Sequence, residues 1–204
     1  GQLVGGGMGM PRFEAAEVGN LELTWLIPLS LIGTICGWLY FVSEHASEAL
    51  AHAIGERPVV KAMLAGLALA ICGTVLPYTM FAGETQADVL METYLTIPAG
   101  VLIATGLVKA MLTPALINLG WRGGHFFPVI FSGVSLGYGL AILTGADPVF
   151  CVAVCTASTM GAVMRQPVMV VGLLLMCFPL KGIVCMIIAA VIAAGIPLPK
   201  PLCK

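Results

Sequence analysis

The stretch GWRGGHFFPVIFSG, residues 120–133, places flexible backbone directly before an apolar segment. Gly123 and Gly124 permit a sharp turn, and Pro128 suits the first turn of a helix, where the amide that proline lacks would have no partner. We therefore expect a helix to begin at residues 125–128. The first amides of a helix lack intrahelical acceptors, and the helix dipole places about half a positive charge there. Such a site binds an anion without a charged side chain, which favours rapid release.

A plain glycine-rich turn between two membrane helices is the alternative, and the composition of the chain fits both. Of the 204 residues, 59% are hydrophobic and only 9% are charged, whereas a soluble domain carries roughly 25% charged residues. We predict an all-α, polytopic integral membrane protein. The net charge is −1 and no basic run occurs, so nucleic acid is not an expected partner. The cysteines show no CxxC or other ligand spacing, so neither a metal site nor a cofactor is expected.

Apolar runs predict the elements that position this stretch. Residues 1–22 are polar and glycine-rich, which indicates an extramembrane lead-in. A first span over residues 23–42 is expected to continue as a polar helix over 43–58, and residues 78–93 to form a polar loop or short helix. Further apolar segments are expected at 59–76, at 97–119 with an interruption at Pro114, at 127–143, at 149–164, and at 168–196 with a split near 179–182. Several are shorter than the about 20 residues of an uninterrupted span, and short, broken segments indicate a transporter's binding site.

Several of these segments resemble the CLC family of chloride channels and proton-coupled chloride antiporters. GGHFFP is similar to the family's Gly-x-Phe-x-Pro motif, which supplies backbone amides to the permeating anion. Residues 25–52 resemble the long helix that opens the second half of the family's subunit. GAVMRQPVMVVGLLLM, residues 161–176, resembles the family's Arg-x-Pro and the following helix, and PKPLC, residues 199–203, its Lys-Pro-Leu-Tyr. The resemblance covers about residues 22–204.

The resemblance implies the second inverted-repeat half of a CLC subunit, formed by residues 23–204. The family's first half carries a Gly-Ser-Gly-Ile-Pro stretch and a Gly-x-Glu-Gly-Pro stretch, of which the latter holds the gating glutamate. Neither stretch occurs in this sequence. We therefore expect the N-terminal CLC half to be missing from this chain, which would provide only part of the anion path. The family also forms homodimers with a separate pore in each subunit.

The resemblance also assigns site residues. The expected anion-binding residues are Gly124, His125, Phe126, Phe127, Pro128 and Cys203. Cys203 stands where the family usually has a tyrosine whose hydroxyl reaches the central anion, and a thiol is a weaker donor. Lys109 falls where many members carry an arginine. Charges inside a membrane suggest function, but we expect Lys109 either to snorkel or to bond loop carbonyls and brace the glycine-rich turn. Arg165 has the same interpretation, and Arg122 in the loop is a candidate for raising the local anion concentration by electrostatic attraction.

We predict that the protein is not an enzyme and moves chloride or another small anion across a membrane, as a voltage-gated channel or in exchange for protons. The expected location is the bacterial cell membrane, and the expected partners are the anion, protons, lipid and a second copy of the chain. One alternative is a non-conducting accessory or relic half-subunit that only packs against other helices. A membrane-embedded lipid enzyme is disfavoured because the apolar runs hold no Asp or Glu apart from Glu22 at the first boundary.

Overall fold

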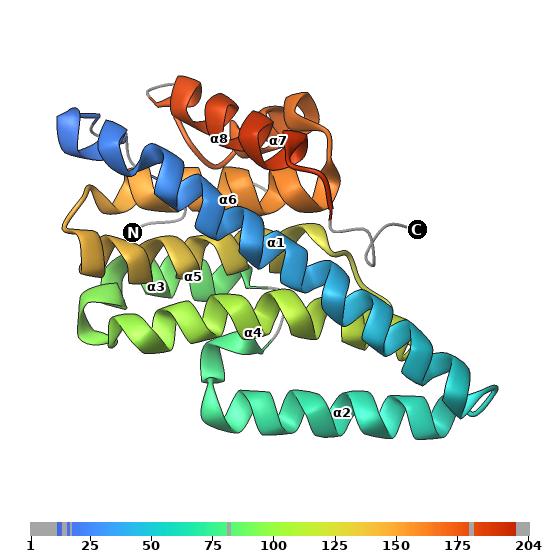
Figure 1. The fold of residues 1–204 in the computed structure, drawn as a ribbon. Coiled ribbons are helices and arrows are strands. Elements are labelled where there is room, and N and C mark those ends of the chain that lie inside the picture. The colour runs from blue at the N-terminus through green and yellow to red at the C-terminus, as the bar shows by residue number, and fades with distance from the viewer. Residues whose placement is uncertain (1–11, 14–15, 17, 81–82, 180–181, 199–204) are drawn as a thin grey trace, which may run out of the picture.

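The computed structural model describes residues 12–13, 16, 18–80, 83–179 and 182–198, and within them all regular structure is helical (Figure 1). The α-helices are α1 Asn20–Ile54, α2 Pro58–Val75, α3 Glu84–Thr93, α4 Ala99–Asn118, α5 Phe126–Thr144, α6 Pro148–Met164, α7 Pro167–Leu174 and α8 Ile183–Gly195. Two 3-10 turns, η1 Pro77–Thr79 and η2 Tyr94–Thr96, flank α3. The all-α prediction is confirmed.

Four helices, α1, α2, α4 and α5, are long and apolar enough to cross a membrane by length and composition. The polytopic prediction is therefore confirmed. With 35 residues, α1 is the longest of the described helices, and at about 1.5 Å per residue it exceeds the roughly 30 Å hydrocarbon core of a bilayer. The predicted extension of the first span through residues 43–58 thus forms one continuous helix with it, ending at Ile54. The predicted short segments are also present as α6, α7 and α8.

Helices α5 and α6 form the centre of the bundle. Every residue from 129 to 141 in α5 and from 150 to 162 in α6 is buried. Helices α1 and α4 pack along this pair, and α8 packs on α6. By contrast, α2 lies beside the bundle (Figure 1), and Ala65 is its one buried residue. Helix α5 is apolar on all sides, and other helices enclose it along most of its length.

Glycines allow the central helices to approach closely. A Cβ added at Gly137 of α5 would lie 2.5 Å from the Cα of Val152 in α6, and one added at Gly133 would lie 2.5 Å from the Cα of Thr156. On another face of α6, a Cβ added at Gly37 of α1 would meet the carbonyl oxygen of Thr159 at 3.0 Å. Helices in lipid associate through such small residues, because the hydrophobic effect gives them no reason to leave the lipid tails.

The expected interruption at Pro114 is wrong, because α4 continues through it to Asn118. A proline inside a helix removes one main-chain bond, and contacts with α1 on both sides of it hold α4 in place. Ser43 Oγ donates to the carbonyl oxygen of Met111 at 2.6 Å, and Asn118 Nδ2 donates to that of Glu44 at 3.0 Å. Neighbouring helices and polar side chains commonly compensate a proline in this way in membrane proteins.

Part of the predicted lead-in packs on the bundle. The ring of Phe13 stacks on that of Phe178 with centroids 4.4 Å apart, and the Phe13 amide donates to the carbonyl oxygen of Cys177 at 2.9 Å. Helix α1 begins at Asn20, three residues before the predicted span at 23, and Glu22 Oε2 accepts a hydrogen bond from the Gly19 amide at 2.9 Å. The capping contact explains the earlier start, since it gives an amide at the helix start an acceptor.

The close approach of α5 and α6 predicts an unequal response to two glycine substitutions. Gly137→Ala inserts a methyl group against the Val152 main chain, and we expect it to destabilise the protein by about 1–3 kcal/mol through overpacking. Gly66→Ala in α2 is the matched control, because a Cβ there meets nothing within 4 Å; its better helix propensity should stabilise the fold slightly. Thermal unfolding in detergent measures both. Equal midpoints for the two variants would contradict the packing described here.

Candidate functional site

The start of α5 carries main-chain amides without acceptors. His125 precedes the helix, Phe126 and Phe127 are its first two residues, and Pro128 has no amide to donate. The first helical bond runs from the Val129 amide to the His125 carbonyl oxygen at 3.1 Å. Within the described parts of the chain, no group accepts a hydrogen bond from the amide of Phe126 or Phe127. The predicted helix start at residues 125–128 is confirmed, and amides without a protein acceptor at such a position are the kind that bind anions.

The loop before α5 is shaped by how α4 ends. Gly120 has a φ of 97°, a left-handed conformation that glycine adopts without strain. The amides of Gly120 and Trp121 donate to the carbonyl oxygens of Ile117 and Leu116, both at 3.0 Å, which closes the last turn of α4. After this turn, Gly123 and Gly124 are exposed, and an added Cβ meets nothing within 4 Å at either position. Their main chain is therefore open on the side where a side chain would lie.

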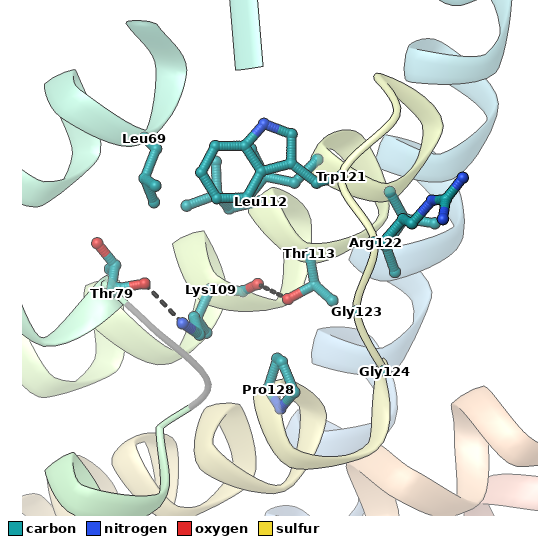
Figure 2. A pocket seen from close by; sticks show the side chains of 12 residues that line it. Leu69, Thr79, Lys109, Leu112, Thr113, Trp121, Arg122, Gly123, Gly124 and Pro128 are labelled. Carbon is teal, nitrogen blue, oxygen red and sulfur yellow. Dashed lines mark hydrogen bonds between the residues drawn. The ribbon is translucent and has the colours of Figure 1, made fainter. Parts of the chain in front are cut away.

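A cavity of about 270 Å³ adjoins this loop. It is bounded by α2, η1, α4, the loop and the first turn of α5. The described residues that line it are Leu69, Thr79, Lys109, Leu112, Thr113, Leu116, Ile117, Trp121, Arg122, Gly123, Gly124 and Pro128 (Figure 2). None of these lining residues is acidic, and two are basic. The lining therefore favours an anion over a cation.

Lys109 lies in the wall of this cavity and is 4% exposed. Its Nζ atom donates to the carbonyl oxygen of Thr79 at 2.6 Å and lies 6.0 Å from the centroid of the Phe131 ring. Lys109 thus bonds a carbonyl of η1, whereas the sequence suggested that it braces the glycine-rich turn. The reason is that α4 presents position 109 to η1, nine residues before the helix ends at Asn118.

Arg165 joins the ends of two helices. It caps α6 in a left-handed conformation with a φ of 57°, and its Nη1 atom donates to the carbonyl oxygen of Ala194 in the last turn of α8 at 3.3 Å. A cation at two helix C-termini is electrostatically favourable. Arg165 therefore bonds a carbonyl of α8, whereas the sequence suggested that it supports the glycine-rich turn. It lies in the α6–α8 part of the bundle and does not line the cavity beside α5.

The remaining predicted residues have different surroundings. The His125 ring stacks on Phe126 with centroids 4.5 Å apart, so it lies along the helix start. The Arg122 side chain points away from Lys109 and Trp121 (Figure 2), although the residue contributes to the cavity wall. Cys203 lies outside the described residues. Among the described residues, no three His, Cys, Asp or Glu side chains are grouped closely enough to hold a metal ion.

Sequence reasoning missed the cavity and the residues that complete it from α2 and η1. Leu69 and Thr79 precede Lys109 by 40 and 30 positions, and no motif connects them with it. The sequence does place Trp121 next to the glycine motif, and a tryptophan beside flexible backbone could have indicated an apolar wall there. The apolar part of the site therefore became apparent only from the arrangement of α2 against α4.

Comparison with known proteins assigns the chain to a family. The sequence matches the family described as "Voltage gated chloride channel" over residues 3–197. The chain belongs to the CLC family. The fold of this chain is similar to that of a chain in the crystal structure of a CLC-type fluoride/proton antiporter. The TM-score is 0.75 and the sequence identity is 21%. The match covers 96% of this chain and 49% of that one, so the chain spans about half the length of the solved protein. No curated protein sequence matched it.

The Lys109–Thr79 bond of this CLC chain predicts a specific loss of stability. We expect Lys109→Met to lower the free energy of unfolding by about 1–3 kcal/mol, because it leaves the buried Thr79 carbonyl oxygen without its donor. Lys61→Met in α2 is the control, since no hydrogen bond of the Lys61 side chain is found among the described residues and the change should cost little. Thermal unfolding in detergent compares them. If the two variants unfold at the same temperature, Lys109 does not hold η1.

Proposed function

We propose that this CLC chain provides one side of a pathway that moves small anions across a membrane, with the amides at the start of α5 as its binding element. The observation that carries the proposal is the pair of amides at Phe126 and Phe127, which meet no acceptor among the described residues. They lie beside the open main chain of Gly123 and Gly124. In this proposal an anion receives hydrogen bonds from main-chain donors and is favoured by the positive end of the helix dipole.

The chemistry of this site suits transport as well as binding. Partial charges on amides attract an anion less strongly than an ion pair would, so the anion can leave quickly. Gly124, His125, Phe126, Phe127 and Pro128 form the proposed site, and the side chain at Cys203 is its proposed further donor. Lys109, 4% exposed in the neighbouring wall, adds a positive potential to the attraction while its ammonium group stays bonded to η1.

We infer chloride as the transported ion because the family description names a chloride channel. The solved relative is named as a fluoride/proton antiporter, which supports fluoride as a second candidate and exchange for protons as the mode of transport. We further propose a homodimer in a cell membrane. Exposed apolar side chains on α7 and α8 support a contact there, among them Val168, Val184 and Val191.

A flux measurement on the intact protein in liposomes tests this function, with a halide electrode outside and an imposed proton gradient. We expect halide release, and a change of its rate with the proton gradient if exchange is coupled. Replacing Phe127 by the corresponding α-hydroxy acid turns its amide into an ester and removes the donor. Because a hydrogen bond to a charged group contributes about 1.5–3 kcal/mol, we expect the apparent halide affinity to fall at least about tenfold.

The same replacement at Phe131 is the matched control. It introduces the identical ester in the middle of α5, where the amide belongs to the helix interior. We expect it to leave halide affinity unchanged while lowering stability slightly. Equal effects at the two positions would contradict a role for the Phe127 amide, and an intact protein that releases no halide would end the proposal of transport and favour a packing role.

A further inference from the structure

The cavity beside the glycine loop has two chemically different parts (Figure 2). One part is apolar and is formed by Leu69 of α2 together with Leu112 and Trp121, whose rings and methyl groups face one another. The other part holds Lys109 and the main chain of Gly123 and Gly124. A small inorganic anion would use only the polar part. The apolar part would then be left facing water, which is unfavourable for a surface of this kind.

The donors of the polar part can be assigned. The hydroxyl groups of Thr79 and Thr113 already donate, to the carbonyl oxygens of Leu76 at 2.7 Å and Lys109 at 2.8 Å. They can therefore accept a hydrogen bond but have no proton to offer an anion. The ammonium group of Lys109 and the loop amides remain as the groups that attract negative charge. Both kinds of group pair well with a carboxylate, which accepts several hydrogen bonds.

The size and lining of the apolar part limit the ligand further. The cavity volume of about 270 Å³ lies just below the range of about 300–1,000 Å³ that is usual for drug-sized ligands. The walls contributed by α2 and α4 are mainly aliphatic, with one face of Trp121. A short hydrocarbon chain fits this description, whereas a large or strongly branched ligand does not.

We propose that this cavity is a binding site for an amphipathic monocarboxylate, the anion of a fatty acid of about eight carbons in a volume of this size. Its carboxylate lies between Lys109 and the Gly123–Gly124 main chain, and its hydrocarbon chain packs against Leu69, Leu112 and Trp121. The ligand could enter from the bilayer beside α2, because the other face of α2 is apolar and exposed there. The exposed fractions of the Met63 and Leu67 side chains are 70% and 58%. The inference rests on the cavity itself and goes beyond the proposed transport of inorganic anions.

Binding of octanoate to the intact protein in detergent tests the proposal, and calorimetry reports the dissociation constant without any ion gradient. Two further ligands separate the contributions of charge and chain. Octanol keeps the hydrocarbon chain without the charge, and acetate keeps the charge without the chain. We expect octanoate to bind at least about tenfold more tightly than either of them. Octanol lacks the interactions of the carboxylate and acetate lacks those of the chain, and a tenfold change in affinity corresponds to about 1.4 kcal/mol.

Two substitutions in the same helix locate the site. We expect Leu69→Ala to weaken octanoate binding by about tenfold, because it removes part of the apolar wall. Leu67→Ala is the matched control, since Leu67 is 58% exposed and does not line the cavity; its affinity should equal that of the unchanged protein. Trp121→Ala provides a second variant from the opposite wall, with the same expected direction.

Three results would overturn the proposal: octanol binding as tightly as octanoate, acetate binding as tightly as octanoate, or Leu69→Ala and Leu67→Ala giving the same affinity. Absence of octanoate binding would overturn it as well. The outcome is independent of the flux measurement. A protein that releases no halide but binds octanoate with this pattern would lose the proposed function and keep the carboxylate site.

Discussion

A main-chain amide that leaves water needs an acceptor, and this requirement governs the arrangement around α5. Most of α5 satisfies it through its own helical bonds, which is what allows residues 129–141 to be buried on every side. At its first residues the requirement is not met by the described protein groups, and Pro128 removes a further donor that would have needed a partner. The amides of Phe126 and Phe127 are thus available to a ligand, and they are fixed in direction by a rigid, enclosed helix.

The packing of the bundle holds α5, and with it the Phe126 and Phe127 amides, in place. Gly133 and Gly137 bring α5 against the main chain of α6, and the glycines of α1 do the same on another face of α6. Polar contacts between α1 and α4 hold the end of α4, from which the glycine-rich loop leads into α5. The loop itself is open. In the proposed function, an anion would reach the amides of an enclosed helix beside a loop whose glycines leave space.

Helix positions could be predicted from the sequence because apolar runs and breakers are local signals. The start of α5 followed from Gly123, Gly124 and Pro128, and the split before α8 from the residues near 179–182. Pro114 was misjudged, because the side chains that stabilise α4 around it come from α1, about 70 positions away. The partner of Lys109 and the cavity depended on the same kind of distant contact, through η1 and α2. The family motif pointed to the helix start at residues 125–128, while the apolar wall beside it had no sequence signal.

The most direct test of the central claim is an experimental structure of the intact protein in bromide, with the ion located by its anomalous scattering. The account predicts a bromide peak within hydrogen-bonding distance of the Phe126 and Phe127 amides, on the side of the open Gly123–Gly124 main chain. A structure in which these amides donate to protein carbonyl groups or face lipid, with no bromide bound to them, would contradict it.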